Sequence, residues 1–126
     1  MANPNIVNVT TINGNSAFAA IGTGSPTDTQ ILSNAASSGK IFKVNSLYIA
    51  NIDGTASADV SVRIYNQATL GGTAFALIST AAVAADSTLV VITKDTAIYI
   101  LENSSIGVFA SASGDLVYHC SWDEIS

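Results

Sequence analysis

Charged residues are scarce in this chain, and basic residues are the scarcest of them. Only 10% of the 126 residues are Asp, Glu, Lys or Arg, against about 25% in an average globular protein. Four basic residues face nine acidic ones, which gives a net charge of −5, and no two basic residues are adjacent. Nucleic acids and anionic membranes are bound by clustered Lys and Arg side chains, so the composition argues against both partners.

Cysteine and long apolar runs are also scarce or missing. The single cysteine, Cys120, cannot form a disulfide within the chain. No run of about 20 apolar residues is present, and the N-terminal MANPNIVNVTT lacks the basic and apolar regions of a signal peptide. We therefore expect a protein that is made in the cytosol and stays soluble.

The residues that are present favour one small domain. Apolar residues make up 48% of the sequence, and a chain of this length buries roughly two-thirds of its unfolded surface. With so few charges, the surface must consist largely of Ser, Thr, Asn, Ala and Gly. Such a surface suits close packing in a dense assembly, although a secreted or cell-surface domain has the same composition.

Residues 1–39 differ from the rest, because they contain no Lys, Arg or Glu and only one Asp. We expect short strands around residues 6–11 and 29–33. Polar segments of this kind bury little apolar area to offset the entropy of ordering. Two interpretations stay open, namely an arm that orders on a partner and an edge strand with loops.

From Lys40 onward, alternating apolar residues predict β-strands. In residues 40–52 the apolar parity shifts between Val44 and Leu47, which predicts a bulge near Asn45 and Ser46. The Asp53-Gly54 turn predicts a hairpin to residues 58–66. In that strand Val60, Val62 and Ile64 should point inward, while Asp59, Ser61, Arg63 and Tyr65 should point outward.

Further strands are expected at residues 73–80, 87–93, 97–101, 106–112 and 115–122. The run LVVI is apolar on both faces, which favours a central strand, and a short helix in AFALISTAAVAA is an alternative. Seven or eight short antiparallel strands are typical of a β-sandwich with jelly-roll or Greek-key connections. The sequence therefore predicts an all-β fold with a polar N-terminal arm (1–39) and a single sandwich domain (40–126).

The chemically rare residues gather in the C-terminal LVYHCSWDEIS. Neighbours in a strand point to opposite faces, so His119 and Cys120 cannot form a catalytic pair, and Asp123 and Glu124 diverge in the same way. Leu116, Tyr118, Cys120 and Trp122 should lie in the core, with Val117, His119, Ser121 and Asp123 outside. We therefore predict no catalytic residues.

Metal and cofactor sites are not predicted either. Zinc sites need several Cys and His ligands, and the chain has one of each. Aspartates in or beside turns could hold calcium, but they show no Asp-x-Asp-x-Asp spacing and usually serve their turns. These aspartates are Asp53, Asp59, Asp86, Asp95 and Asp115.

Candidate partner contacts are the aromatic and apolar residues that the pattern leaves outside. Tyr is enriched where proteins meet proteins, and it also stacks on sugars. Together with apolar residues of the arm, the candidates are Ile6, Val7, Val9, Tyr48, Tyr65 and Tyr99. Single aromatic residues at strand edges are an equally good explanation of each tyrosine.

Three segments together carry a family resemblance: GKIFKVNSLYIANIDGTASADVSVRIYN, AADSTLVVITKDTAIYILENSSI and SASGDLVYHCSWDEIS. Over residues 39–126 the chain resembles small virion structural proteins of tailed bacteriophages, best known from phages of cyanobacteria and other aquatic bacteria. Members open with a sequence like MANPNIVNVT and end with a motif like SYEEIS, here SWDEIS. Where members read LEEGD this chain has LENSSIG, which weakens any shared acidic site.

The resemblance implies a virion structural protein. Within that class we favour a capsid decoration or cement protein that bridges capsid subunits. The major capsid protein or other virion proteins would be its partners, and the chain would form a homo-oligomer. Alternatives are a neck, tail, baseplate or fibre-associated virion protein, and a carbohydrate-binding sandwich that uses Tyr48, Tyr65 or Tyr99. A hydrolase would need His119 or an acid pair and is the least favoured reading.

Overall fold

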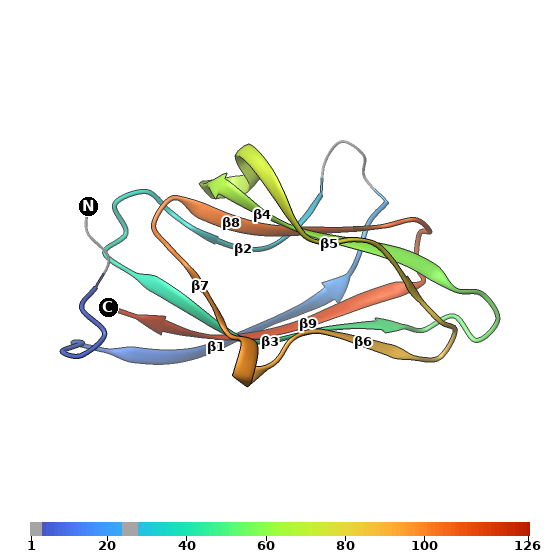
Figure 1. Cartoon of the computed structure of the whole chain (residues 1–126), viewed down its shortest axis with the longest axis horizontal. Helices are drawn as coiled ribbons and strands as arrows, with labels where there is room; N and C mark the ends of the chain where they lie inside the picture. The colour runs from blue at the N-terminus through green and yellow to red at the C-terminus, as the bar shows by residue number, and fades with distance from the viewer. Residues whose placement is uncertain (1–3, 24–27) are drawn as a thin grey trace.

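The computed structural model describes residues 4–23 and 28–126, which form two antiparallel sheets packed face to face (Figure 1). Sheet A has the order β1 (Ile12–Ala20), β9 (Leu116–Ile125), β3 (Ile41–Asn51) and β6 (Thr88–Ile92), and β7 (Ile98–Ile100) also pairs with β3. Sheet B has the order β2 (Thr29–Asn34), β8 (Ser104–Ala110), β4 (Ala58–Gln67) and β5 (Gly71–Val83). Two short 3-10 turns, η1 (Ala68–Leu70) and η2 (Lys94–Thr96), complete the described structure.

The strand pairs are nested in the way that defines a jelly roll. The outermost pair is β1 with β9, followed inward along the chain by β2 with β8, β3 with β6 and β7, and β4 with β5. Successive pairs alternate between the two sheets, so the chain winds around one core. The predicted antiparallel β-sandwich is confirmed, with nine strands in the described residues.

Aliphatic side chains from both sheets fill the space between them. On β9, Leu116, Tyr118 and Cys120 are buried while His119 and Ser121 are exposed, as the predicted parity requires. Trp122 is half-buried and packs against the core, and Val117 and Asp123 are half-buried rather than exposed. The alternation arises because one face of each strand is removed from water. The side chains with least exposure in this core include Ile21, Val44, Leu47, Ile49, Val60, Val62, Ile92, Ile100, Ile106, Val108 and Leu116.

The predicted bulge in β3 is also confirmed. The register between β3 and β9 shifts between Val44 and Ser46, which leaves Asn45 as the extra residue. Because the bulge reverses the parity, Val44 before it and Leu47 after it both reach the core.

Two predictions about strand placement are wrong. Residues 52–57 do not close a hairpin, because β3 lies in sheet A and β4 in sheet B, and the loop carries the chain between them. Asn51 holds this crossover by donating to the carbonyls of Ala56 and Val83, at 2.9 Å each. The run LVVI is not central either, since β6 is an edge strand whose Val90 is exposed.

Of the two short strands predicted in the N-terminal segment, one is in the wrong position. Residues 6–11 are not a strand; the main chain turns there, with Asn8 N–H donating to the carbonyl of Asn5 at 3.1 Å. The first strand is instead β1, and the strand expected at residues 29–33 is confirmed as β2. The helical alternative for AFALISTAAVAA is wrong, because these residues lie mostly in β5. Among the described residues, no helix has the length and apolar character of a membrane span.

Candidate interaction surface

The outer face of sheet A is open to solvent and carries a row of four large side chains. Phe18 of β1 is opposite His119 of β9, His119 is opposite Tyr48 of β3, and Tyr48 is opposite Val90 of β6. We call these four residues the aromatic row. The residues next to them in the same strands, such as Tyr118 and Ile49, are buried. Because neighbours in a strand point to opposite faces, the side chains of the aromatic row must project outward.

The aromatic row is exposed along its whole length. Phe18 is 70% exposed, Val90 48% and Tyr48 40%, and His119 is also exposed. The Phe18 and His119 rings are stacked, with their centroids 5.9 Å apart. Apolar and aromatic side chains aligned across four strands form a continuous surface, unlike the single exposed apolar residues found on most proteins.

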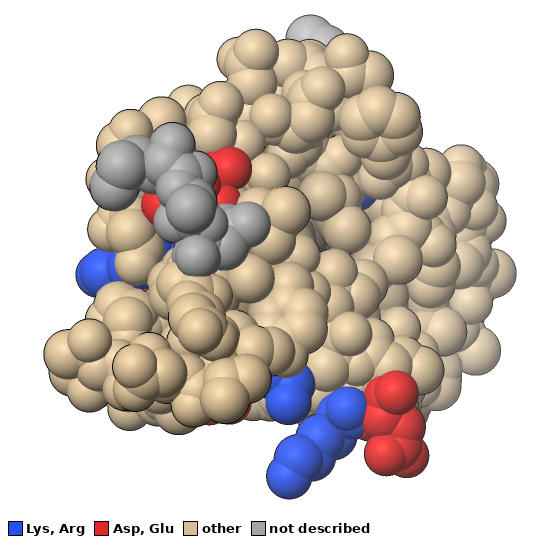
Figure 2. Space-filling view, turned by 60° about the vertical axis from the view of Figure 1, so that its left-hand side comes forward, with Lys and Arg blue, Asp and Glu red and all other residues tan. Residues whose placement is uncertain are grey.

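A second row on the same face contains its charged residues. Asp123 of β9 is opposite Lys43 of β3, and Lys43 is opposite Tyr99 of β7, which is also exposed. Opposite charges in adjacent strands keep the net charge of the face near zero. Figure 2 shows one side of the molecule, on which charged residues form only a few small groups among uncharged ones.

The outer face of sheet B is covered in part by the chain itself. The carboxylate of Asp28 is buried against it and accepts hydrogen bonds from Arg63 Nε at 2.9 Å and Tyr65 Oη at 2.7 Å, as well as from Arg63 Nη2. A Cβ on Gly107 of β8 would lie 2.8 Å from Asp28 Cβ and 2.9 Å from Leu70 Cδ2. Gly107 therefore allows Asp28 and η1 to lie directly on the sheet.

This cover buries Tyr65, which the sequence places among the exposed tyrosines. Tyr65 projects to the outer side of sheet B as its parity predicts, but only 8% of its surface is exposed, so the expectation of a free contact residue is wrong. Burial, and then the hydrogen bond to Asp28, raise the pKa of Tyr65. The same carboxylate raises the pKa of Arg63 by accepting its hydrogen bonds.

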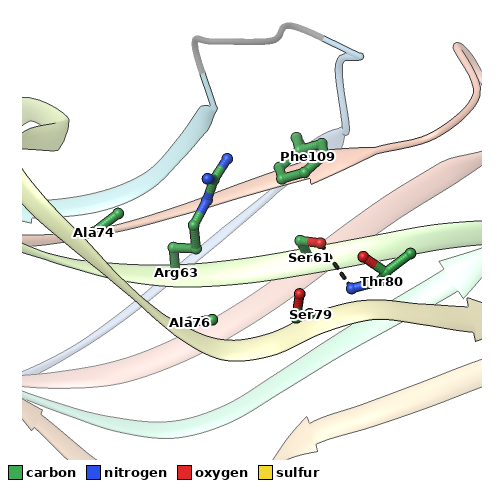
Figure 3. A pocket seen from close by; sticks show the side chains of 7 residues that line it. All are labelled: Ser61, Arg63, Ala74, Ala76, Ser79, Thr80 and Phe109. Atoms are coloured by element: carbon green, nitrogen blue, oxygen red, sulfur yellow. Dashed lines mark hydrogen bonds between the residues drawn. The ribbon is translucent and has the colours of Figure 1, made fainter.

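Beside the Asp28 cover, sheet B has a hollow of about 300 Å³ between β4, β5 and β8 (Figure 3). Two of its polar side chains, Arg63 and Ser61, are already engaged. The guanidinium of Arg63 lies 4.6 Å from the centre of the Phe109 ring and is paired with Asp28, and Ser61 Oγ accepts from Thr80 N–H at 2.9 Å. The remaining lining residues are Ala74, Ala76 and Ser79. Among the lining residues there is no general base, such as a His or a carboxylate, that could activate a serine or threonine hydroxyl.

A second hollow, of about 530 Å³, lies along β1, β9 and the bulge of β3. Its lining includes Asn45 and Trp122, whose Oδ1 and Nε1 atoms are buried without a hydrogen-bond partner in the described chain. Buried polar atoms without partners are uncommon in folded proteins. The other lining residues are Gly14, Asn15, Ser16, Ser121 and Asp123.

The rare residues of the C-terminal strand do not assemble a reactive site. Cys120 is 1% exposed, and burial raises the pKa of its thiol to about 12, so the reactive thiolate is suppressed. His119 lies on the opposite face and stacks on Phe18. Within residues 4–23 and 28–126, no three His, Cys, Asp or Glu side chains are placed to hold a metal ion.

The sequence candidates are therefore divided in space. Tyr48 and Tyr99 lie on the outer face of sheet A, whereas Tyr65 lies under the cover of sheet B. Ile6 and Val7 are exposed and Val9 is half-buried, in the segment that precedes β1. Thr10 and Thr11 fasten the end of this segment by donating their N–H groups to the Ser126 carbonyl, at 2.7 and 3.0 Å.

Sequence reasoning missed Phe18, His119 and Val90 as parts of the surface. Phe18 is the only aromatic residue among the first 40, which was the one available signal. Its alignment with His119, Tyr48 and Val90 depends on pairing between strands more than 25 residues apart in sequence, which no local pattern encodes. No protein-family model matches the chain, and no curated protein matches it either.

Proposed function

We propose that this protein is a structural protein of a tailed-phage virion, where it decorates the head and stabilises it by bridging neighbouring capsid subunits. The resemblance of residues 39–126 to small phage virion proteins supports the assignment to a virion. The observation that carries the decorating role is the aromatic row on the open face of sheet A, where Lys43 and Asp123 lie in a separate row. The jelly roll supports it further, because this fold recurs in viral capsid domains.

The aromatic row has the composition of a protein-contact surface. The centres of protein interfaces are enriched in aromatic residues and depleted of charged ones, and Tyr is among the residues that contribute most to binding. Tyr48 lies at the middle of sheet A, between His119 and Val90. Contacts to several capsid subunits at once would raise the effective concentration for each further contact, so that a row of four side chains could hold the protein on the head.

The segment before β1 provides a second contact in this proposal. Val7 is 91% exposed, and Ile6 is exposed beside it. Exposed apolar residues in this segment, which is tied to the body by the hydrogen bonds of Thr10 and Thr11, would pack against a capsid subunit. Removal of residues 1–9 leaves β1 intact and should weaken head binding without unfolding the sandwich, as measured by circular dichroism and by co-sedimentation with heads.

Head binding by Tyr48→Ala tests the proposal directly. Phage heads that lack the protein are mixed with the purified wild type, with Tyr48→Ala, or with Phe75→Ala as the matched control. Phe75 is 59% exposed on β5, away from the aromatic row. Tyr48→Ala should lose binding while the control retains it; equal binding by all three proteins would refute the assigned surface.

Copy number distinguishes head decoration from the other virion positions. Quantitative mass spectrometry of purified particles should give a number comparable to that of the major capsid protein. A number comparable to that of neck, tail, baseplate or fibre proteins, which form small rings, would refute decoration in favour of those positions.

Carbohydrate binding is the second candidate, and the hollow beside Asn45 and Trp122 favours it. A buried acceptor, a buried donor and polar neighbours that include the Asp123 carboxylate are groups that can orient a sugar hydroxyl. Saturable binding on a glycan array, lost in Asn45→Ala but kept in Tyr48→Ala, would support this candidate. Absence of binding to any glycan would dismiss it without affecting the decoration proposal.

A further inference from the structure

The free edge of β1 differs from the other sheet edges of the described chain. Edge strands are normally protected from pairing with other chains by short length, charge, proline or bulges. At the other edges, β2 has six residues and a register shift, β5 is interrupted by three register shifts against β4, and β6 and β7 are short and separated by η2. In contrast, β1 pairs with β9 at nine successive positions without a shift, and it contains no charged residue or proline.

The unpaired backbone groups of β1 belong to its even-numbered residues. Thr11 exchanges hydrogen bonds with Ser126, and Ile21 N–H donates to the Leu116 carbonyl, so odd-numbered positions face β9. In an antiparallel strand the intervening residues direct their N–H and C=O groups to the other side. Gly14, Ser16 and Phe18 therefore present donors and acceptors along an edge that no other described strand covers.

Two residues of β1 are unusual for an exposed edge strand. Gly14 has no positive φ, and a Cβ added to it would have no atom within 4 Å, although glycine weakens a strand. Phe18 is a large apolar residue with 70% of its surface exposed. Glycine inside a strand often marks the close approach of another chain, and an aromatic residue on a neighbouring strand can cover it.

We propose that β1 pairs antiparallel with β1 of a second copy, about a two-fold axis at Ser16, so that the two A sheets join. Even-numbered residues must face even-numbered ones, because those carry the free backbone groups. With Ser16 opposite Ser16, Phe18 of each copy lies opposite Gly14 of the other, so each exposed ring covers one bare glycine. The strand is complementary to itself and carries no charge to repel its copy, which favours a second copy over a different chain.

The oligomeric state of the full chain tests this proposal, which does not depend on the virion assignment. Sedimentation across a concentration series should show wild type approaching twice the chain mass of 12.9 kDa. Ser16→Pro should be monomeric, because it removes an N–H that faces away from β9 and so leaves the β1–β9 ladder intact. Ser16→Lys, which places like charges directly opposite each other, should be monomeric as well and covers the case in which the proline variant misfolds.

The matched control is Thr88→Lys, since Thr88 is exposed on β6 at the other edge of sheet A. This variant should remain dimeric. As a check of register, Ser16→Cys should form a disulfide-linked dimer under mild oxidation, whereas Thr88→Cys should not; native Cys120 is buried and does not interfere. A wild type that stays monomeric, or dimers that persist in both Ser16→Pro and Ser16→Lys, would overturn the proposal, as would binding of a capsid strand to a monomeric β1 edge.

Discussion

The outer faces of the two sheets show how one strand pattern yields two different surfaces. Both faces carry residues that alternate with buried ones, so both should be equally open by parity alone. On sheet A the row of Phe18, His119, Tyr48 and Val90 is exposed. On sheet B, Tyr65 has the same outward parity but is buried. The difference comes from cover supplied by distant parts of the chain.

The cover of sheet B depends on one carboxylate. Asp28 precedes β2, contacts the sheet at Gly107 and accepts hydrogen bonds from both Arg63 and Tyr65. A buried charge is tolerated only where such partners replace water. Sheet A has no corresponding residue in the described chain, and its outer face stays free for a partner. The covered face therefore serves stability, and the open face serves binding in the proposed function.

The largest expected effect contrasts the two sides of β9. Cys120 faces the core with a pKa raised to about 12, whereas Ser121 faces outward and is exposed. A cysteine introduced by Ser121→Cys should react with a thiol reagent much faster than native Cys120, because burial both shields the native thiol and raises its pKa. Comparable rates in native protein would mean that β9 does not separate core from surface as described.

Loss of the Asp28 carboxylate should have the largest effect on stability. Asp28→Ala leaves the Arg63 charge and the Tyr65 hydroxyl without their partner, which should lower the free energy of unfolding by about 3 kcal/mol, measured by urea denaturation. Glu124→Ala is the control, because it breaks the more exposed pair with Lys40 and should cost less than about 1 kcal/mol. Equal losses would show that the cover of sheet B contributes no special stability.

Two glycines give a matched test of covered and open faces. Gly107→Ala brings a Cβ within 3 Å of Asp28 and Leu70 and should destabilise the fold by about 2 kcal/mol through overpacking. Gly14→Ala meets no atom within 4 Å and should stabilise the monomer by about 0.5 kcal/mol, because alanine loses less backbone entropy. Thermal denaturation at low protein concentration compares them, and a destabilised Gly14→Ala monomer would contradict an open face.

The sequence was sufficient for those features that depend on neighbours along the chain. Alternation predicted the all-β fold and the parity of β9, because burial on one side of a strand imposes a period of two. The parity shift between Val44 and Leu47 predicted the bulge at Asn45 for the same reason. Local rules of this kind do not depend on which strands become partners.

Features that depend on distant pairing could not be predicted. The Asp53-Gly54 turn has hairpin chemistry, yet it crosses between sheets, because β3 is already flanked by β9 on one side and by β6 and β7 on the other. Tyr65 has the parity of an exposed residue and is buried by Asp28, 37 positions away. The aromatic row likewise exists only because four separate strands align. Candidate contact residues were therefore named individually, and their grouping came from the fold.

The smallest expected effect comes from single hydroxyl groups on the two faces. Tyr65→Phe removes a hydrogen bond to a buried carboxylate and should cost about 1.5 kcal/mol at neutral pH, while Tyr48→Phe on the open face should cost almost nothing. The pKa of Tyr65 is raised in the folded state, so the stability from its protonated form is present below the ordinary pKa near 10 and is lost as pH rises through the folded value. The stability difference between wild type and Tyr65→Phe should therefore shrink above pH 10. Tyr118 and Cys120, whose pKa values are also raised, act equally in both proteins and cancel from this difference. A difference that stays constant to high pH would show that the Tyr65 hydroxyl is not held by Asp28 beneath a cover.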